Sequence, residues 1–134
     1  MKNNSARVII IGAGLTGLTT AYLLKKEGVN ALLLEARDRI GGRIQTVYSD
    51  TEAPFELGAT WLGKKHTALV KLLQELGLAM HEQVLGKTAV YEHLSTSPPQ
   101  LVTLPPNTDP SYRIKGGTST LINRLADHLS LIHI

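Results

Sequence analysis

Apolar and polar positions at the start of the chain alternate in a pattern that predicts a strand, a helix and a second strand. The runs Val8–Ile11 and Ala31–Leu34 are short and aliphatic, as buried strands are. Between them, residues 15–26 carry apolar side chains at helical spacing, and Gly28 supplies a stop. The helix would place four apolar side chains near one side: Leu15, Leu18, Tyr22 and Leu23.

The rest of the chain has a weaker pattern that predicts further helices and strands. A leucine-rich stripe indicates an amphipathic helix that Gly77 would end. Thr118 or Ser119 would cap the last helix. In chain order, we expect a strand over 44–48, a helix over 66–76, strands over 88–93 and 100–104 joined by a turn at 97–99, a loop over 105–110 and a helix over 119–128.

The turn after the first strand reads Gly12-Ala13-Gly14-Leu15-Thr16-Gly17 and opens the first helix. Gly12 allows a sharp turn, Gly14 lets a pyrophosphate approach the backbone, and Gly17 lets the helix pack close to the sheet. The helix start adds unpaired N–H groups and a partial positive charge for the phosphates. This pattern predicts a dinucleotide-binding βαβ unit.

An acidic residue completes the pattern at the end of the second strand. Glu35 follows the glycines at about the 20-residue spacing of this fingerprint. Its carboxylate can accept hydrogen bonds from a ribose 2′-hydroxyl and would repel a 2′-phosphate. The pattern up to this point leaves both NAD and FAD open.

The segment after Glu35 distinguishes the two cofactors. Residues 36–43 read A-R-D-R-I-G-G-R and resemble the E-A-R-x-R-x-G-G-R extension of the flavin-containing amine oxidase family, which includes monoamine and polyamine oxidases. Gly41 and Gly42 let the backbone pass near a ligand, and Arg43 would add positive charge close to the diphosphate. A solvated basic loop would explain the arginines but not the double glycine. The resemblance favours FAD.

Two later segments carry the same resemblance. Residues 55–63 resemble the family's D-x-G-x-x-W segment beside the flavin ring, with Glu56 where aspartate is usual. Residues 112–121 resemble its G-G-x-x-x-L segment. The resemblance and the turn together give these candidate cofactor-binding residues: Gly12, Ala13, Gly14, Leu15, Thr16, Gly17, Glu35, Ala36, Arg37, Gly42, Arg43, Gly58, Ala59, Thr60 and Trp61.

The expected fold class is α/β, an incomplete Rossmann-like FAD-binding βαβ domain followed by the start of a substrate-facing region. Residues 1–66 would form the FAD-binding core, 67–111 the beginning of the substrate-facing excursion, and 112–128 the return to the FAD domain. The resemblance implies hydride transfer from an amine to FAD, with molecular oxygen as a common acceptor. None of the residues has a recognisable catalytic role. We therefore expect residues 1–134 alone to be inactive and to retain flavin weakly or not at all.

The last six residues, 129–134, read L-S-L-I-H-I. They resemble the translation of a transposase adapter used in sequencing libraries, and a natural apolar helix end is the alternative. We expect an adapter-derived tail and assign it no function.

Composition excludes several other classes of protein. A net charge of +3 without interleaved aromatic residues does not indicate nucleic-acid binding. The chain has no cysteine, which excludes disulfides and thiolate metal sites and fits a cytoplasmic location. No membrane segment and no secretory signal are expected. Four histidines lack metal-ligand spacing, so no metal site is expected: His66, His81, His93 and His128.

Two alternatives stay open. One is another FAD oxidoreductase with the same motifs, such as a protoporphyrinogen oxidase or a carotenoid desaturase. The other is a non-enzymatic protein built like the Rab GDP-dissociation inhibitors, which would bind a protein partner. Glu35, Arg43 and Trp61 together count against the second alternative, because such proteins lack an intact flavin-binding set.

Overall fold

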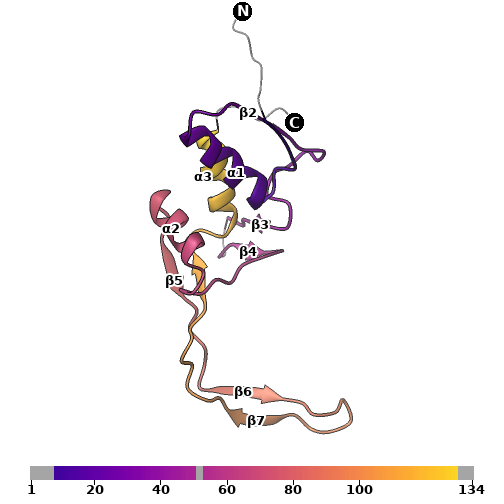
Figure 1. Cartoon of the computed structure of the whole chain (residues 1–134). Coiled ribbons are helices and arrows are strands. Elements are labelled where there is room, and N and C mark those ends of the chain that lie inside the picture. Colours follow the sequence, from indigo (N-terminus) through magenta and orange to yellow (C-terminus); the bar gives the residue numbers. More distant parts are fainter. Residues whose placement is uncertain (1–7, 51–52, 130–134) are drawn as a thin grey trace, which may run out of the picture.

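The computed structural model describes residues 8–50 and 53–129, and it begins with the predicted βαβ unit (Figure 1). Strand β1 (Val8–Ile11), helix α1 (Leu15–Lys26) and strand β2 (Ala31–Leu34) have the predicted bounds. The strands are parallel, with Val8 opposite Ala31 and Ile11 opposite Leu34. Gly28 has φ +71° and ends α1 as expected.

The remaining elements form two helices and three antiparallel strand pairs in the described part of the chain. Strand β3 pairs with β4, β5 with β8, and β6 with β7. The sequence pattern did not predict β4, β5 or β8. The bounds are β3 (Thr46–Val47), β4 (Phe55–Glu56), α2 (Thr67–Glu75), β5 (Met80–Glu82), β6 (Thr88–Tyr91), β7 (Gln100–Thr103), β8 (Tyr112–Ile114) and α3 (Ser119–His128).

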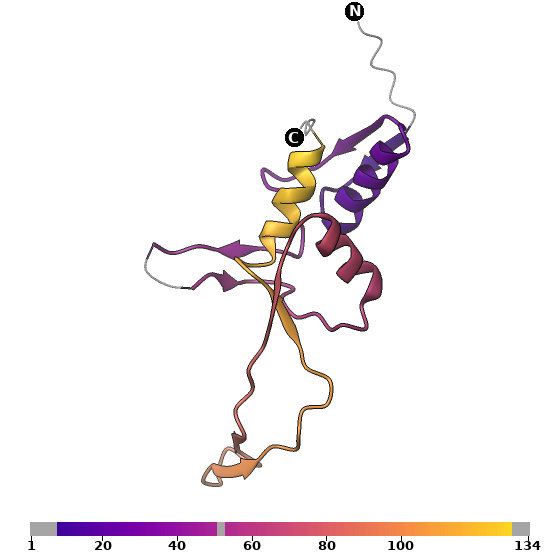
Figure 2. The ribbon, with the colours of Figure 1, turned by 90° about the vertical axis from the view of Figure 1, so that its left-hand side faces the viewer.

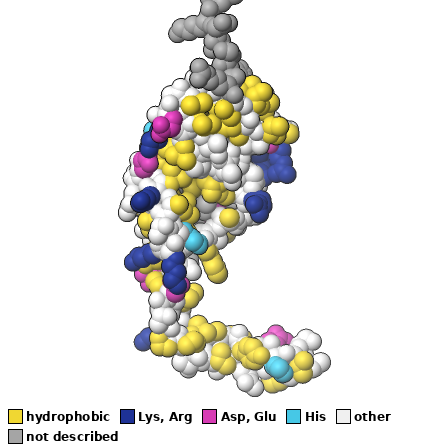
Figure 3. All heavy atoms as spheres, in the orientation of Figure 1, with side chains coloured by type: hydrophobic (Ala, Val, Ile, Leu, Met, Phe, Trp, Pro, Cys, Tyr) yellow, Lys and Arg dark blue, Asp and Glu magenta, His cyan; other side chains and the backbone are white. Residues whose placement is uncertain are grey.

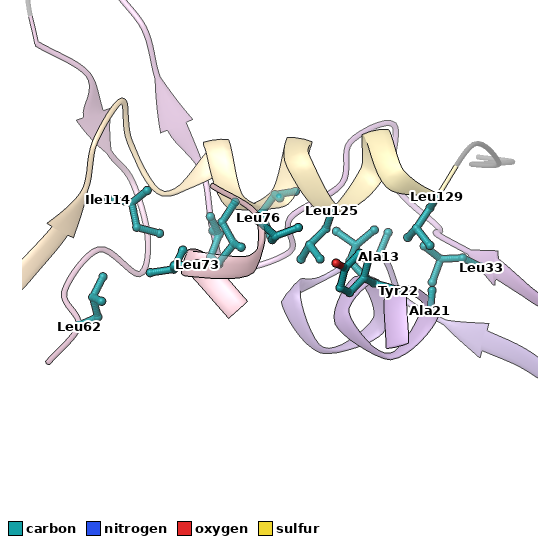
Figure 4. Close-up of a cluster of buried hydrophobic side chains, with 14 of the residues drawn as sticks. Ala13, Ala21, Tyr22, Leu33, Leu62, Leu73, Leu76, Ile114, Leu125 and Leu129 are labelled. Atoms are coloured by element: carbon teal, nitrogen blue, oxygen red, sulfur yellow. The ribbon is translucent and has the colours of Figure 1, made fainter. Parts of the chain in front are cut away.

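The core lies between the three helices and the inner face of the β1–β2 sheet (Figure 4). Its most deeply buried large side chains are Leu18, Leu73, Leu121, Ile122 and Leu125. None of the helices formed by residues 8–50 and 53–129 is long and apolar enough to cross a membrane.

One predicted core side chain is outside the core. Leu23 was expected beside Leu18 and Tyr22, but 49% of it is exposed. At 3.6 residues per turn, position 23 points about 140° away from position 18. Ala21 is buried on this face instead, because it is closer to Leu18 around the helix.

Helix α3 is capped by residues of the β3–β4 ribbon. The N–H of Thr118 donates to Glu56 Oε1 at 2.6 Å, and the N–H of Ser119 donates to Thr46 Oγ1 at 2.9 Å. The Thr46 hydroxyl in turn donates to Glu56 Oε2 at 2.8 Å. These bonds satisfy N–H groups that a helix start leaves free.

Thr118 occupies the N-cap position of α3 as expected, but its side chain makes no capping hydrogen bond. Its backbone angles are helical, φ −67° and ψ −25°, and not the extended ones from which an N-cap side chain reaches the N–H groups of the first turn. Its hydroxyl is buried without a partner among the described residues. Ser119 Oγ instead accepts the Thr46 N–H at 2.8 Å.

A polar network joins the helices at the edge of the core. The Tyr22 hydroxyl of α1 donates to Glu75 Oε1 of α2 at 2.6 Å, and Lys26 forms an ion pair with the same carboxylate. Lys25 Nζ donates to the His128 carbonyl of α3 at 2.5 Å. The pKa of Glu75 is held below its ordinary value of 4.5 because Lys26 and Tyr22 donate to its charged form.

We expect the stabilisation that this network gives to be lost in acid. The pKa of Glu75 is lower in the folded chain than in the unfolded chain, so its contribution is complete above 4.5 and disappears as the pH falls through the folded pKa. Urea unfolding at a series of pH values should show a smaller acid loss for Glu75→Gln than for the wild type. Glu92→Gln, an exposed control in the hairpin connection, should keep the wild-type dependence. Equal acid losses for all three proteins would contradict the assignment.

The β6–β7 hairpin lies at the end of a long arm, away from the helices (Figures 1 and 2). Its register runs from Thr88 opposite Thr103 to Tyr91 opposite Gln100. The predicted strand pair is confirmed, although both strands end earlier than expected. Apolar side chains are exposed along the arm (Figure 3), namely Val84, Leu85, Val90, Tyr91, Leu94 and Leu101.

Only the first residue of the predicted tail is described. Leu129 follows α3 and is buried with the core side chains (Figure 4). Residues 130–134, including His133, lie outside the described residues.

Candidate functional site

Three glycines in the turn between β1 and α1 have different structural roles. Gly12 has φ +99°, and its N–H donates to the Leu34 carbonyl at 2.7 Å. A Cβ atom on Gly17 would lie 2.0 Å from the Gly12 carbonyl oxygen, whereas one on Gly14 would meet nothing within 4 Å. The close packing expected of Gly17 is confirmed, and the backbone at Gly14 is open.

Helix α1 begins without a side-chain cap. Gly14 occupies the N-cap position, and the Leu18 N–H donates to its carbonyl at 3.0 Å. In the described part of the chain, no acceptor takes the N–H groups of Leu15, Thr16 or Gly17. Their dipoles make this helix start suitable for an anion.

The side chains of this turn do not all face the opening. Ala13 is completely buried in the core (Figure 4), and Leu15 packs against it. Both were predicted to bind a cofactor. The Ala13 side chain is closed off from a cofactor in this conformation, whereas Leu15 is only partly buried.

Glu35 lies at the end of β2 and is bonded directly to the turn. Its Oε2 accepts the Ala13 N–H at 2.7 Å, and its Oε1 accepts the Arg37 N–H at 3.0 Å. These two bonds hold the pKa of Glu35 below its ordinary value. A carboxylate has about four acceptor sites, so it can take a further donor beside the turn.

The double glycine packs against the same turn. The Gly41 N–H donates to the Ala13 carbonyl at 2.8 Å, and Gly41 has φ +98°. A Cβ atom on Gly42 would lie 3.4 Å from the Gly14 Cα atom. The two glycine-rich segments therefore form one continuous backbone surface.

Two arginines of this loop have different environments. Arg39 donates from Nη2 to the Gly42 carbonyl at 2.9 Å and from Nη1 to the Ile40 carbonyl at 3.3 Å. Arg39 therefore stabilises the loop, a role that no sequence motif indicated. Arg43 is exposed, and among the described residues its guanidinium has no hydrogen bond or ion pair.

The segment predicted to lie beside the flavin ring packs on the backbone of Arg43. A Cβ atom on Gly58 would lie 2.0 Å from the Arg43 carbonyl oxygen. The same oxygen accepts the Ala59 N–H at 3.2 Å. Gly58 thus has a packing reason to be glycine besides any contact with a ligand.

The side chains of Thr60 and Trp61 have different surroundings. Thr60 Oγ1 accepts a hydrogen bond from Arg113 Nε at 3.1 Å, a contact that no sequence motif indicated. Trp61 is 67% exposed and lines a cavity of about 240 Å³ together with His66 and Asp109.

The structure brings most of the predicted residues into one chain of contacts. Residues 12–17 contact Glu35 and residues 41–42, and Arg43 continues this surface to residues 58–59. Ala36 and Arg37 are exposed next to Glu35. Trp61 faces a separate cavity in this conformation.

Comparison with known proteins gives consistent matches. The family model described as "Flavin containing amine oxidoreductase" matches residues 15–111. The chain is 35% identical over 103 residues to amine oxidase [flavin-containing] A of Sus scrofa, covering 77% of this chain and 20% of the relative. It is 40% identical over 81 residues to the L-amino acid oxidase of Cerastes cerastes, covering 60% of this chain and 16% of that protein.

The solved structures agree with these matches. Wild-type putrescine oxidase bound to putrescine is 39% identical, with a TM-score of 0.62 over 75% of this chain and 23% of that protein. Cyclohexylamine oxidase from Brevibacterium oxydans is 34% identical, with a TM-score of 0.63 over 75% of this chain. The chain therefore spans about a fifth of the length of the relatives it matches.

Proposed function

The chain belongs to the flavin-containing amine oxidoreductase family, and from this premise we propose that it is the FAD-binding part of an amine-oxidising enzyme. Membership confirms the family resemblance and the α/β fold class, and it identifies the cofactor as FAD. The same matches do not favour the two alternatives, a protoporphyrinogen oxidase-like or carotenoid desaturase-like enzyme and a protein like the GDP-dissociation inhibitors.

The observation that carries this proposal is the open backbone surface where the 12–17 turn meets Gly41 and Gly42. Gly14 has space where a side chain would stand, and beside it begin the N–H groups of α1 that no described residue accepts. Such a surface fits a diphosphate, because the phosphate oxygens need donors and close approach. Arg43 would add positive charge to that group.

Other residues would position the rest of the cofactor. Glu35, fixed by Ala13 and Arg37, would accept a ribose hydroxyl. Residues 58–61 would lie beside the flavin ring. When bound, FAD supplies the hydride acceptor for oxidation of the carbon next to an amine, and we propose molecular oxygen as the final acceptor.

We also propose that different segments of the chain belong to different domains. Residues 1–66 and 112–128 would belong to the FAD-binding domain, and residues 67–111 would begin the substrate-facing region. The capping of α3 by Glu56 supports this proposal, because it joins residues 112–128 to the segment before residue 67.

Competition titrations test the proposed cofactor site. We expect the chain to change FAD fluorescence saturably, and to lose the flavin on gel filtration because the binding is weak. AMP should displace FAD at least about tenfold better than adenosine 2′,5′-bisphosphate, which differs from AMP only in the 2′-phosphate that Glu35 repels. Glu35→Gln should reduce this preference, while Glu92→Gln should preserve it. The proposal fails if FAD gives no saturable change, or if both nucleotides compete equally with the wild type.

A further inference from the structure

Strand β8 places Arg113 beside the segment proposed to face the flavin. Arg113 is half-buried, and its Nε donates to Thr60 Oγ1 at 3.1 Å. The bond fixes the plane of the guanidinium but uses only the Nε donor. Within residues 8–50 and 53–129, neither Nη group has a protein partner, and no carboxylate forms an ion pair with Arg113. A positioned guanidinium with both Nη groups available is suited to a planar anion.

A second basic side chain lies next to Arg113. His81 of β5 is directly opposite Arg113 in the antiparallel β5–β8 register, so both side chains lie on the same face of the ribbon. Both line a cavity of about 160 Å³, to which Pro54 and Gly116 also contribute. The cavity has room for a carboxylate and a short carbon chain.

One acidic group lines the same cavity. Glu56 could repel an anion, but the Thr118 N–H and the Thr46 hydroxyl donate to its two oxygens. The start of helix α3 also stabilises its charge. Among the described residues that line the cavity, Arg113 is thus a charged side chain that no carboxylate neutralises.

We propose that Arg113, held by Thr60 and assisted by His81, binds the carboxylate of the substrate. The two Nη groups would donate to the two carboxylate oxygens, in the bidentate geometry that arginine favours. The substrate would then be an amine that also carries a carboxylate, because Thr60 connects this site to the flavin-facing segment. The location next to the reaction centre rests on the proposed function, whereas carboxylate binding by the chain does not.

Trp61, the one tryptophan of the chain, lines the neighbouring cavity and directly follows Thr60, so it can report on this site through the shared backbone. We expect propionate to change Trp61 fluorescence and the amide shifts of Thr60 and Arg113 saturably, without FAD present. Propylamine, which has no carboxylate, should give no saturable change. Arg113→Gln should weaken propionate binding about tenfold, the loss expected for a charge-assisted bond. Arg113→Lys should bind with intermediate affinity, because lysine keeps the charge without the fork.

Lys115→Gln is the matched control, since Lys115 is an exposed cation on the residue after β8 and does not line the cavity. It should bind propionate as the wild type does, and circular dichroism should show that all variants fold. The site would be overturned if propionate changed neither Trp61 fluorescence nor the amide shifts saturably, or if Arg113→Gln and Lys115→Gln lost equal affinity for it. Tighter binding of inorganic phosphate than of propionate would overturn the carboxylate assignment. An FAD titration on the same sample tests the proposed cofactor site independently of propionate binding.

Discussion

Replacing Gly17 with alanine is expected to destroy the βαβ unit. The added Cβ atom would lie 2.0 Å from the Gly12 carbonyl oxygen, 3.2 Å from the Gly12 carbonyl carbon and 3.3 Å from Ile10 Cγ2. Two of these three atoms are backbone. The Gly12 backbone cannot easily move, because its N–H is bonded to Leu34 on the neighbouring strand. We expect a loss of more than about 3 kcal/mol in the free energy of unfolding, above the usual cost of overpacking.

The direction of this effect is diagnostic. In an exposed helix, replacing glycine with alanine stabilises by about 1 kcal/mol, so helix propensity alone predicts the opposite sign. Urea unfolding followed by circular dichroism would measure the difference. Gly86→Ala is a suitable control, since its Cβ atom would be 3.5 Å from the nearest atom, the Thr88 carbonyl oxygen, an ordinary contact. A Gly17→Ala protein as stable as this control would contradict the packing described for α1.

Replacing Gly14 with alanine is expected to leave the fold intact and to weaken FAD binding. Gly14 has φ −76° and ψ −179°, an extended conformation open to any residue, and its Cβ atom would meet nothing within 4 Å. The methyl group would instead occupy the space through which a diphosphate reaches the backbone. We expect the affinity for FAD to fall at least about tenfold, corresponding to about 1.4 kcal/mol.

The measurement pairs an unfolding curve with an FAD titration for each variant. Gly14→Ala should match the wild type in the first experiment and differ from it in the second, while Gly86→Ala should match it in both. Unchanged FAD affinity in Gly14→Ala would place the diphosphate elsewhere. The same chemical change, made three positions apart along the turn, therefore separates packing from ligand binding.

The first strand, helix and second strand could be predicted to the residue because their signals are local. Aliphatic runs end at polar residues or glycine, and Gly28 stops α1 within one turn of its last residue. Helix α3 was also predicted with its observed bounds. The β5–β8 pairing was not predicted, because both strands are short and the residues of the arm separate them in the sequence.

Contacts between distant residues account for the other differences. The cap of α3 comes from Glu56, 62 positions before Thr118, so inspection of the helix sequence could not reveal it. In the site, motifs identified the glycines and Glu35, since each motif joins residues close in sequence. Motifs did not indicate that Arg113 donates to Thr60, because that contact depends on how β8 returns to the body.

The bonds around Ala13 have a consequence for the kinetics of ligand binding. Its N–H is held by Glu35 and its carbonyl by Gly41, while Gly12 is tied to Leu34. Glycine-rich turns normally lose much conformational entropy when a ligand orders them. Here that loss occurs during folding, so a cofactor meets a turn that is already preorganised. Its association rate should then be set by diffusion and charge, with little contribution from loop rearrangement.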